Sequence, residues 1–136
     1  MSASGSRDTG PGLGPWAALE LDPDPAAVRQ ARAFIARHCR ARGACDDLCD
    51  TAVLLASEIV TNAFLHGRSR TRLAVATSTT HVRVEVSDDN SRHPITPAPD
   101  TDALDGRGIT IVQMLASAWG VRDEPLGKTV WFQIDT

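Results

Sequence analysis

The stretch of sequence that decides the fold is Leu54-Leu55-Ala56-Ser57-Glu58-Ile59-Val60-Thr61-Asn62-Ala63-Phe64-Leu65-His66-Gly67, in a chain of 136 residues. A helix turns once in about 3.6 residues, so Glu58, Asn62 and His66 fall on one stripe that drifts only about 40° per step. Apolar residues border this stripe: Leu55, Ile59, Val60, Ala63 and Phe64. Such groups are costly to bury without a ligand, and together they can hold a hydrated cation and a proton acceptor. On these three residues alone, a helix flank that faces solvent is the favoured interpretation.

The sequence around this helix predicts one strand and two helices in the N-terminal half. Asp22-Pro23-Asp24-Pro25 suits a helix start, because proline fits the first turn. Gly43 and Gly67 suit helix ends. The predicted elements are a strand over 16–21, a helix over 25–42 and a helix over 46–66.

The C-terminal half predicts four strands and one helix. The strands are expected over 72–77, 81–87, 119–122 and 128–134, and the helix over 106–117. The 89–105 segment contains three prolines and no periodicity, which is typical of a functional or disordered loop. This order predicts an α/β (α+β) two-layer sandwich with helices over one face of a mixed sheet.

Asp88 follows a strand whose alternation directs Val82, Val84 and Val86 inward and Arg83 and Glu85 outward. Asp88 is in phase with the valines, and an inward-facing carboxylate at a strand end is unusual. The alternative is that the strand has already ended and Asp88 caps a turn.

Gly106-Arg107-Gly108 opens a predicted helix, where free N–H groups favour phosphate and glycine allows close approach. A tight turn that needs glycine only for its dihedral angles is the alternative. Two other phosphate motifs are excluded. A P-loop ending at Gly127-Lys128-Thr129 needs glycine at Arg122, and a Rossmann motif needs glycine at Ile111.

The order of these motifs resembles the N, G1, G2 and G3 boxes of the GHKL (histidine kinase/HSP90-like) ATP-binding superfamily. The chain is most similar to its RsbW-like branch, the anti-sigma-factor serine kinases and their single-domain bacterial relatives. The resemblance covers Pro15 to the C-terminus and implies a Bergerat-type ATP-binding fold.

The resemblance implies ATP and Mg²⁺ as cofactors. It also implies a role for each polar residue of the helical stripe and for Asp88. Asp88 matches the aspartate that accepts the adenine amino proton, and Asn62 matches the magnesium-ligating asparagine. Glu58 matches the catalytic general base of the kinases. For Glu58 and His66, a structural hydrogen-bond network near the helix end is an almost equally good interpretation.

The remaining nucleotide-binding residues are expected by the same match. His66 would support the phosphates or the helix end. The Gly106, Arg107, Gly108 and Ile109 segment would contact the phosphates, and Thr129 matches the threonine of the last box.

The Asp-x-Gly-x-Gly box of the family reads Asp88-Asp89-Asn90-Ser91-Arg92 here, without either glycine. Asn90 tolerates a left-handed conformation and can replace the first glycine as a nucleotide-binding residue. Arg92 stands at the second position, where the family's lid begins.

Composition and charge predict the class of partner, the domain organisation and the localisation. The net charge is −3 and no apolar stretch has membrane-spanning length, so nucleic acid and membrane are not expected partners. Residues 1–14 are expected to be a flexible tail without a signal peptide, followed by one domain over 15–136. The chain is therefore expected to be cytoplasmic.

The three cysteines Cys39, Cys45 and Cys49 lie around one predicted loop. Their spacing lacks a regular zinc pair, so buried or half-buried free thiols are expected rather than a metal or redox site.

Three functional classes follow. The first is an Mg-ATP-binding regulator that transfers the γ-phosphoryl group to a serine or threonine of a small STAS-like antagonist. The second is a non-catalytic module that binds ATP or ADP and captures a protein partner, which loss of the box glycines favours. The third, a thiol sensor, ranks below both. A sigma factor as partner and a homodimer are further expectations from the resemblance.

Overall fold

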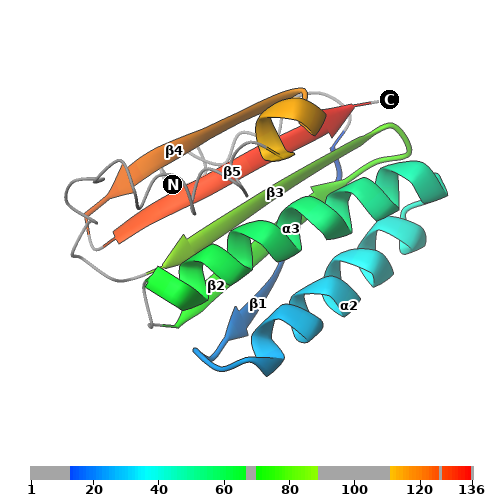
Figure 1. Cartoon of the computed structure of the whole chain (residues 1–136). Helices are drawn as coiled ribbons and strands as arrows, with labels where there is room; N and C mark the ends of the chain where they lie inside the picture. Colours follow the sequence, from blue (N-terminus) through cyan, green and yellow to red (C-terminus); the bar gives the residue numbers. More distant parts are fainter. Residues whose placement is uncertain (1–12, 67–69, 89–110, 126, 136) are drawn as a thin grey trace.

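The computed structural model describes residues 13–66, 70–88, 111–125 and 127–135. These residues form two layers, with two long helices lying side by side over one face of a five-stranded sheet (Figure 1). The strand order is β1-β2-β3-β5-β4. The predicted fold class, helices over one face of a sheet, is confirmed.

Each predicted element within the described residues is present, with small shifts at its ends. Residues 111–115 are also helical, within the helix predicted over 106–117. The elements are β1 (Ala17–Leu21), α2 (Ala26–Ala41), α3 (Asp46–His66), β2 (Thr71–Thr77), β3 (His81–Asp88), β4 (Ala118–Glu124) and β5 (Gly127–Asp135).

The ends of α2 follow from local chemistry. The Asp24 carboxylate accepts a hydrogen bond from the backbone N–H of Ala26 at 2.7 Å, which satisfies one of the free donors at the helix start. At the other end Gly43 has a φ of 84°, a left-handed conformation that glycine adopts without a steric penalty. Its N–H donates to the Arg40 carbonyl at 3.0 Å, so the chain leaves the helix there.

The sheet differs from the expected mixed sheet, because all four of its described pairings are antiparallel. The cause is the connection between β1 and β2. The α2–α3 hairpin brings the chain back to the end of the sheet where β1 finished, so β2 must run in the opposite direction. The two hairpins β2–β3 and β4–β5 are antiparallel for the same geometric reason.

The core lies between the helices and the sheet. Ile35 of α2, Leu55 of α3 and Phe132 of β5 are each fully buried. Burying an aliphatic or aromatic side chain of this size stabilises a fold by about 1.5–3 kcal/mol. The core therefore holds α3 in a fixed position above β3, and this fixes the groups at the end of both elements.

The opposite face of the sheet carries a buried carboxylate. Glu85 points outward as predicted, yet only 1% of the residue is exposed. Its oxygens lie 3.2 Å from Arg122 Nη2 and 3.5 Å from Arg83 Nε. The Arg83 guanidinium in turn lies 4.2 Å from the ring centroid of Trp131. Outward position does not mean exposure here, because long side chains of neighbouring strands cover the carboxylate.

Candidate functional site

Asp88 is the last residue of β3, so the strand has not ended before it. It pairs with Thr71 of β2 on one side and with Lys128 of β5 on the other. The strand alternation continues through Asp88, so its side chain shares the helix-covered face with Val84 and Val86. Only 9% of Asp88 is exposed. The strand thus ends on a nearly buried carboxylate in the position that the sequence predicted.

The polar stripe of α3 borders the buried side of the helix. Leu55 and Ile59 are buried, while Glu58 and Asn62 are half-buried. Within the described residues, no hydrogen bond or ion pair is recorded for either of these two polar side chains. His66 is the last residue of α3, and its side chain lies outside the described part. The carboxylate and the carboxamide thus lie partly exposed at the border of the core.

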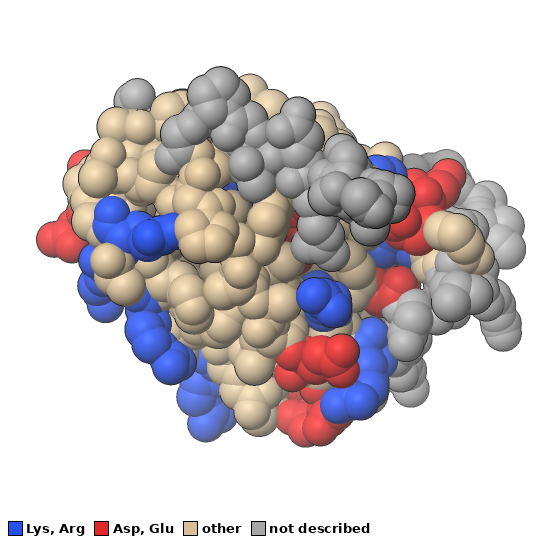
Figure 2. All heavy atoms as spheres, turned by 180° about the vertical axis from the view of Figure 1, so that it is seen from behind, with Lys and Arg blue, Asp and Glu red and all other residues tan. Residues whose placement is uncertain are grey.

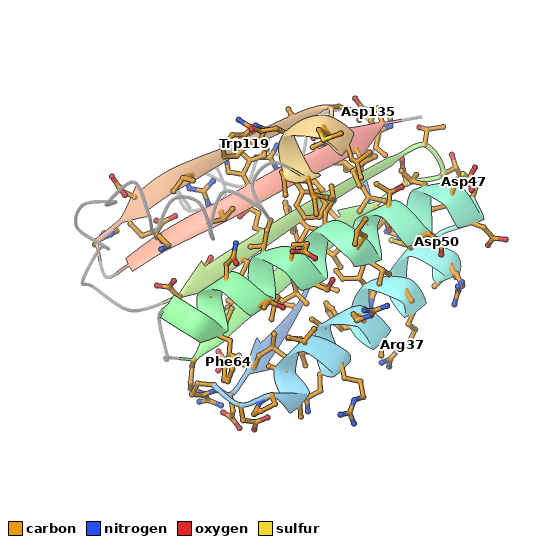
Figure 3. All side chains as sticks on the ribbon, in the orientation of Figure 1. Arg37, Asp47, Asp50, Phe64, Trp119 and Asp135 are labelled. Atoms are coloured by element: carbon orange, nitrogen blue, oxygen red, sulfur yellow. The ribbon has the colours of Figure 1, made fainter. Side chains whose placement is uncertain are left out.

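Asp88 and the polar stripe of α3 lie at the same end of the molecule. In Figure 1, α3 ends, β3 ends and β5 begins on the left side of the view. Phe64, labelled in Figure 3, marks this end of α3, and Asp47 marks the other. Since α3 packs on β3, Asn62 and Asp88 both belong to this end of the interface between helix and sheet.

The side chains of Lys128 and Thr129 lie on opposite faces of the sheet. Thr129 Oγ1 lies 2.8 Å from Ser87 Oγ and donates to Glu124 Oε2 at 3.1 Å, on the outer face. Lys128, one residue earlier, therefore points to the helix-covered face beside Asp88. The structure brings Lys128 to the site and separates Thr129 from it by the sheet. Sequence reasoning did not select Lys128, because only the strand register reveals its neighbour.

The predicted phosphate-binding segment falls outside the described residues. Asn90, Gly106, Arg107, Gly108 and Ile109 all belong to the 89–110 gap. Their nucleotide-binding roles stay predictions.

On the outer face of the sheet, the charged Arg122 guanidinium is hydrogen-bonded to two carboxylates. Burial alone lowers the pKa of Arg122, but hydrogen bonds to Glu124 and Glu85 outweigh it and raise the pKa above the ordinary arginine value. Arg122 donates to Glu124 at 2.9 Å and to Glu85 at 3.2 Å. The guanidinium therefore stays charged and joins β3, β4 and β5 on this face.

The expected free thiols are confirmed for Cys39 and Cys49, which are fully buried, whereas Cys45 is exposed. Burial is the largest cause that raises the pKa of Cys39 from the ordinary 9.0 to about 12, and it also raises the pKa of Cys49. A protonated, buried thiol is a poor nucleophile and metal ligand.

The donor chemistry of the site suits a nucleotide with a magnesium ion better than a fully protein-held metal. No group of three or more His, Cys, Asp or Glu side chains that could hold a metal occurs among the described residues. Mg²⁺ commonly takes one or two protein oxygens and completes its shell with phosphates and waters. Asn62 offers such an oxygen. Separately, none of the described helices is long and apolar enough to cross a membrane.

Comparison with known proteins agrees with this geometry. The family model described as "Histidine kinase-like ATPase domain" matches residues 21–134. Because it matches most of the sequence, this chain belongs to the histidine kinase-like ATPase domain family. No curated protein matches significantly.

Among solved structures, the chain is similar to the one titled "The crystal structure of the RsbU and RsbW domains of Rv1364c from Mycobacterium tuberculosis". The TM-score is 0.68, with 22% identity over 90% of this chain and 32% of that chain. At this identity the match shows a shared fold. The chain spans about a third of the length of that crystallised chain. The predicted GHKL resemblance is confirmed, and the fold agrees with its RsbW-like branch.

Proposed function

We propose that this protein binds ATP with Mg²⁺ at the end of the α3–β3 interface. The observation that carries the proposal is the nearly buried Asp88 carboxylate, at the end of β3 that also holds the C-terminal part of α3. An ionised carboxylate is only an acceptor. It accepts a hydrogen bond from the amino group of adenine and disfavours the carbonyl that guanine has at the same place.

Asn62 would hold the magnesium ion together with phosphate oxygens. Its carboxamide oxygen is a hard ligand, and no partner in the described residues occupies it. Lys128, at the position paired with Asp88 on the neighbouring strand, would add a positive charge at the edge of the site.

We further propose that the site transfers the γ-phosphoryl group to a serine or threonine of a small STAS-like antagonist protein. Glu58 lies one turn before Asn62 on α3, so a base at Glu58 would sit next to the metal and phosphates. It would accept the proton of the acceptor hydroxyl as the hydroxyl oxygen attacks the γ-phosphorus. The bond to the β,γ-bridging oxygen breaks, and ADP leaves with the electron pair.

A phosphotransfer assay tests this second step. Purified protein, γ-labelled ATP and Mg²⁺ are incubated with a panel of STAS-domain proteins, and label on serine or threonine is measured. Glu58→Gln should retain ATP affinity and lose transfer by roughly 100-fold or more, as expected for a general base. Asp47→Asn, at the far end of α3 in Figure 3, is the matched control and should transfer normally.

Two results would decide against the kinase. Full transfer by Glu58→Gln would remove Glu58 as the base. ATP binding without transfer to any tested acceptor would favour the non-catalytic module that captures a partner. The absence of both glycines from the Asp88–Arg92 box favours that second candidate, because the glycines allow the lid to approach the phosphates.

A further inference from the structure

A groove of about 490 Å³ runs between α2 and α3 on the solvent side of the helix layer, away from the sheet. Arg29, Arg32 and Arg40 of α2 line one side of it. In Figure 2, basic side chains form a row along the lower left edge, where Figure 1, from the opposite side, places α2. The groove is separate from the candidate nucleotide site, which belongs to the opposite flank of α3.

The three arginines form one stripe along α2, because spacings of three, eight and eleven residues return to the same helix face. Helix α2 contains no aspartate or glutamate, so no carboxylate of its own neutralises this stripe. No ion pair of Arg29, Arg32 or Arg40 is recorded within the described part of the chain. By contrast, Arg70, Arg83 and Arg122 each pair with a carboxylate.

The floor of the groove is apolar. It is formed by the small side chains of Ala33 and Ala36 and by Val53 and Leu54 of α3. Leu54 is 41% exposed, so part of its apolar side chain can contact another molecule. Small residues next to an exposed leucine leave room for apolar side chains from another molecule. Asp50, labelled in Figure 3, is the acidic residue of the lining.

We propose that this groove docks an acidic amphipathic helix of a partner protein. Apolar side chains of the partner would pack on Leu54 and the alanines, and its carboxylates would pair with the arginines. Charge complementarity favours this occupant, because the arginine stripe stands out on a chain whose net charge is −3. An apolar floor suits a peptide better than a nucleic-acid backbone, which needs a wider basic surface.

The proposal predicts that the bound helix is acidic and that it binds at the groove arginines. The probe is a fluorescent designed helix of about five turns, with leucines at i, i+3, i+4 and i+7 and glutamates on both flanks. Fluorescence anisotropy at low salt should show saturable binding to the wild-type protein. Arg32→Glu/Arg40→Glu should weaken binding by at least ~10-fold, and added salt should weaken the wild-type complex.

Arg37→Glu is the matched control, since Arg37 is an exposed arginine of α2 outside the groove lining. It should bind the acidic helix within about twofold of wild type after correction for net charge. Leu54→Ser should also weaken binding. A probe with lysine in place of every glutamate should not bind wild type, and should bind Arg32→Glu/Arg40→Glu, which shows that this variant is folded.

Several outcomes would overturn the proposal. Equal losses from Arg37→Glu and Arg32→Glu/Arg40→Glu would mean nonspecific attraction. Binding of a single-stranded oligonucleotide through the same arginines, without binding of the acidic helix, would assign the stripe to nucleic acid. ATP binding should be unchanged in all groove variants, so failure at the groove is distinct from failure of the nucleotide site.

Discussion

Asp88 at the end of β3 and Lys128 near the start of β5 occupy directly paired positions, and both side chains point to the face that the helices cover. Paired residues on one face have Cβ atoms about 4.5–5.5 Å apart, so the two side chains are direct neighbours. Thr129, which follows Lys128, hydrogen-bonds on the other face. The pairing therefore makes Lys128, and not Thr129, the neighbour of the carboxylate that we propose binds adenine.

Lys128→Ala is expected to weaken ATP binding by about tenfold, equivalent to about 1.4 kcal/mol. Thr129→Val should leave affinity within about threefold. It should instead lower the free energy of unfolding by about 1–2 kcal/mol, because Ser87 and Glu124 lose the buried hydroxyl to which they are hydrogen-bonded. Calorimetric titration and urea denaturation of both variants measure the two effects. The reverse pattern would place Thr129, as the family match implies, in the nucleotide site.

The buried Glu85 on the outer face should be important for stability. Glu85→Ala leaves the guanidinium groups of Arg83 and Arg122 without their shared carboxylate, and breaking a buried ion pair costs about 3–5 kcal/mol. We expect a loss toward the lower end of this range, since both arginines keep some contact with solvent. Urea denaturation gives the value.

Glu20→Ala is the control for this measurement. Glu20 pairs with Arg70 at 3.6 Å, but both side chains are more than half exposed, so the expected loss is about 0–1 kcal/mol. Equal losses in the two variants would show that Glu85 is not specially stabilised by its partners.

The cysteines should differ in reactivity. In the native protein at pH 8, Cys45 should react with an aromatic disulfide reagent, while Cys39 and Cys49 should react only after unfolding. Burial raises the pKa of Cys39 to about 12, so at pH 8 its thiol stays protonated as well as inaccessible. Stopped-flow absorbance counts the fast thiols. Three fast thiols in the native protein would revive the thiol-sensor hypothesis.

Much of the fold could be predicted from the sequence, because local signals agree with the tertiary structure. The Val82–Val84–Val86 alternation predicted both the strand and the face that Asp88 occupies. Asp24 and Gly43 marked the limits of α2 through capping and a left-handed residue. These features depend on a few neighbouring residues, and sequence reasoning handles such features well.

Other features depend on which strands become neighbours, and the sequence did not predict them. Glu85 is buried because Arg122, 37 residues away, reaches it from β4. Lys128 lies beside Asp88 because of the β3–β5 register. The antiparallel sheet follows from the return of the α2–α3 hairpin.

The most direct test of the central claim is calorimetric titration of the protein with ATP and ADP, with and without Mg²⁺. We expect binding of both nucleotides, with ATP binding strengthened by the ion. Asp88→Asn, which replaces an acceptor-only group by an amide, should weaken binding by roughly 10- to 100-fold, as expected for a lost hydrogen bond to a charged group. Asp47→Asn should bind as wild type. No nucleotide binding by the folded wild-type protein would contradict the account, and so would unchanged affinity in Asp88→Asn.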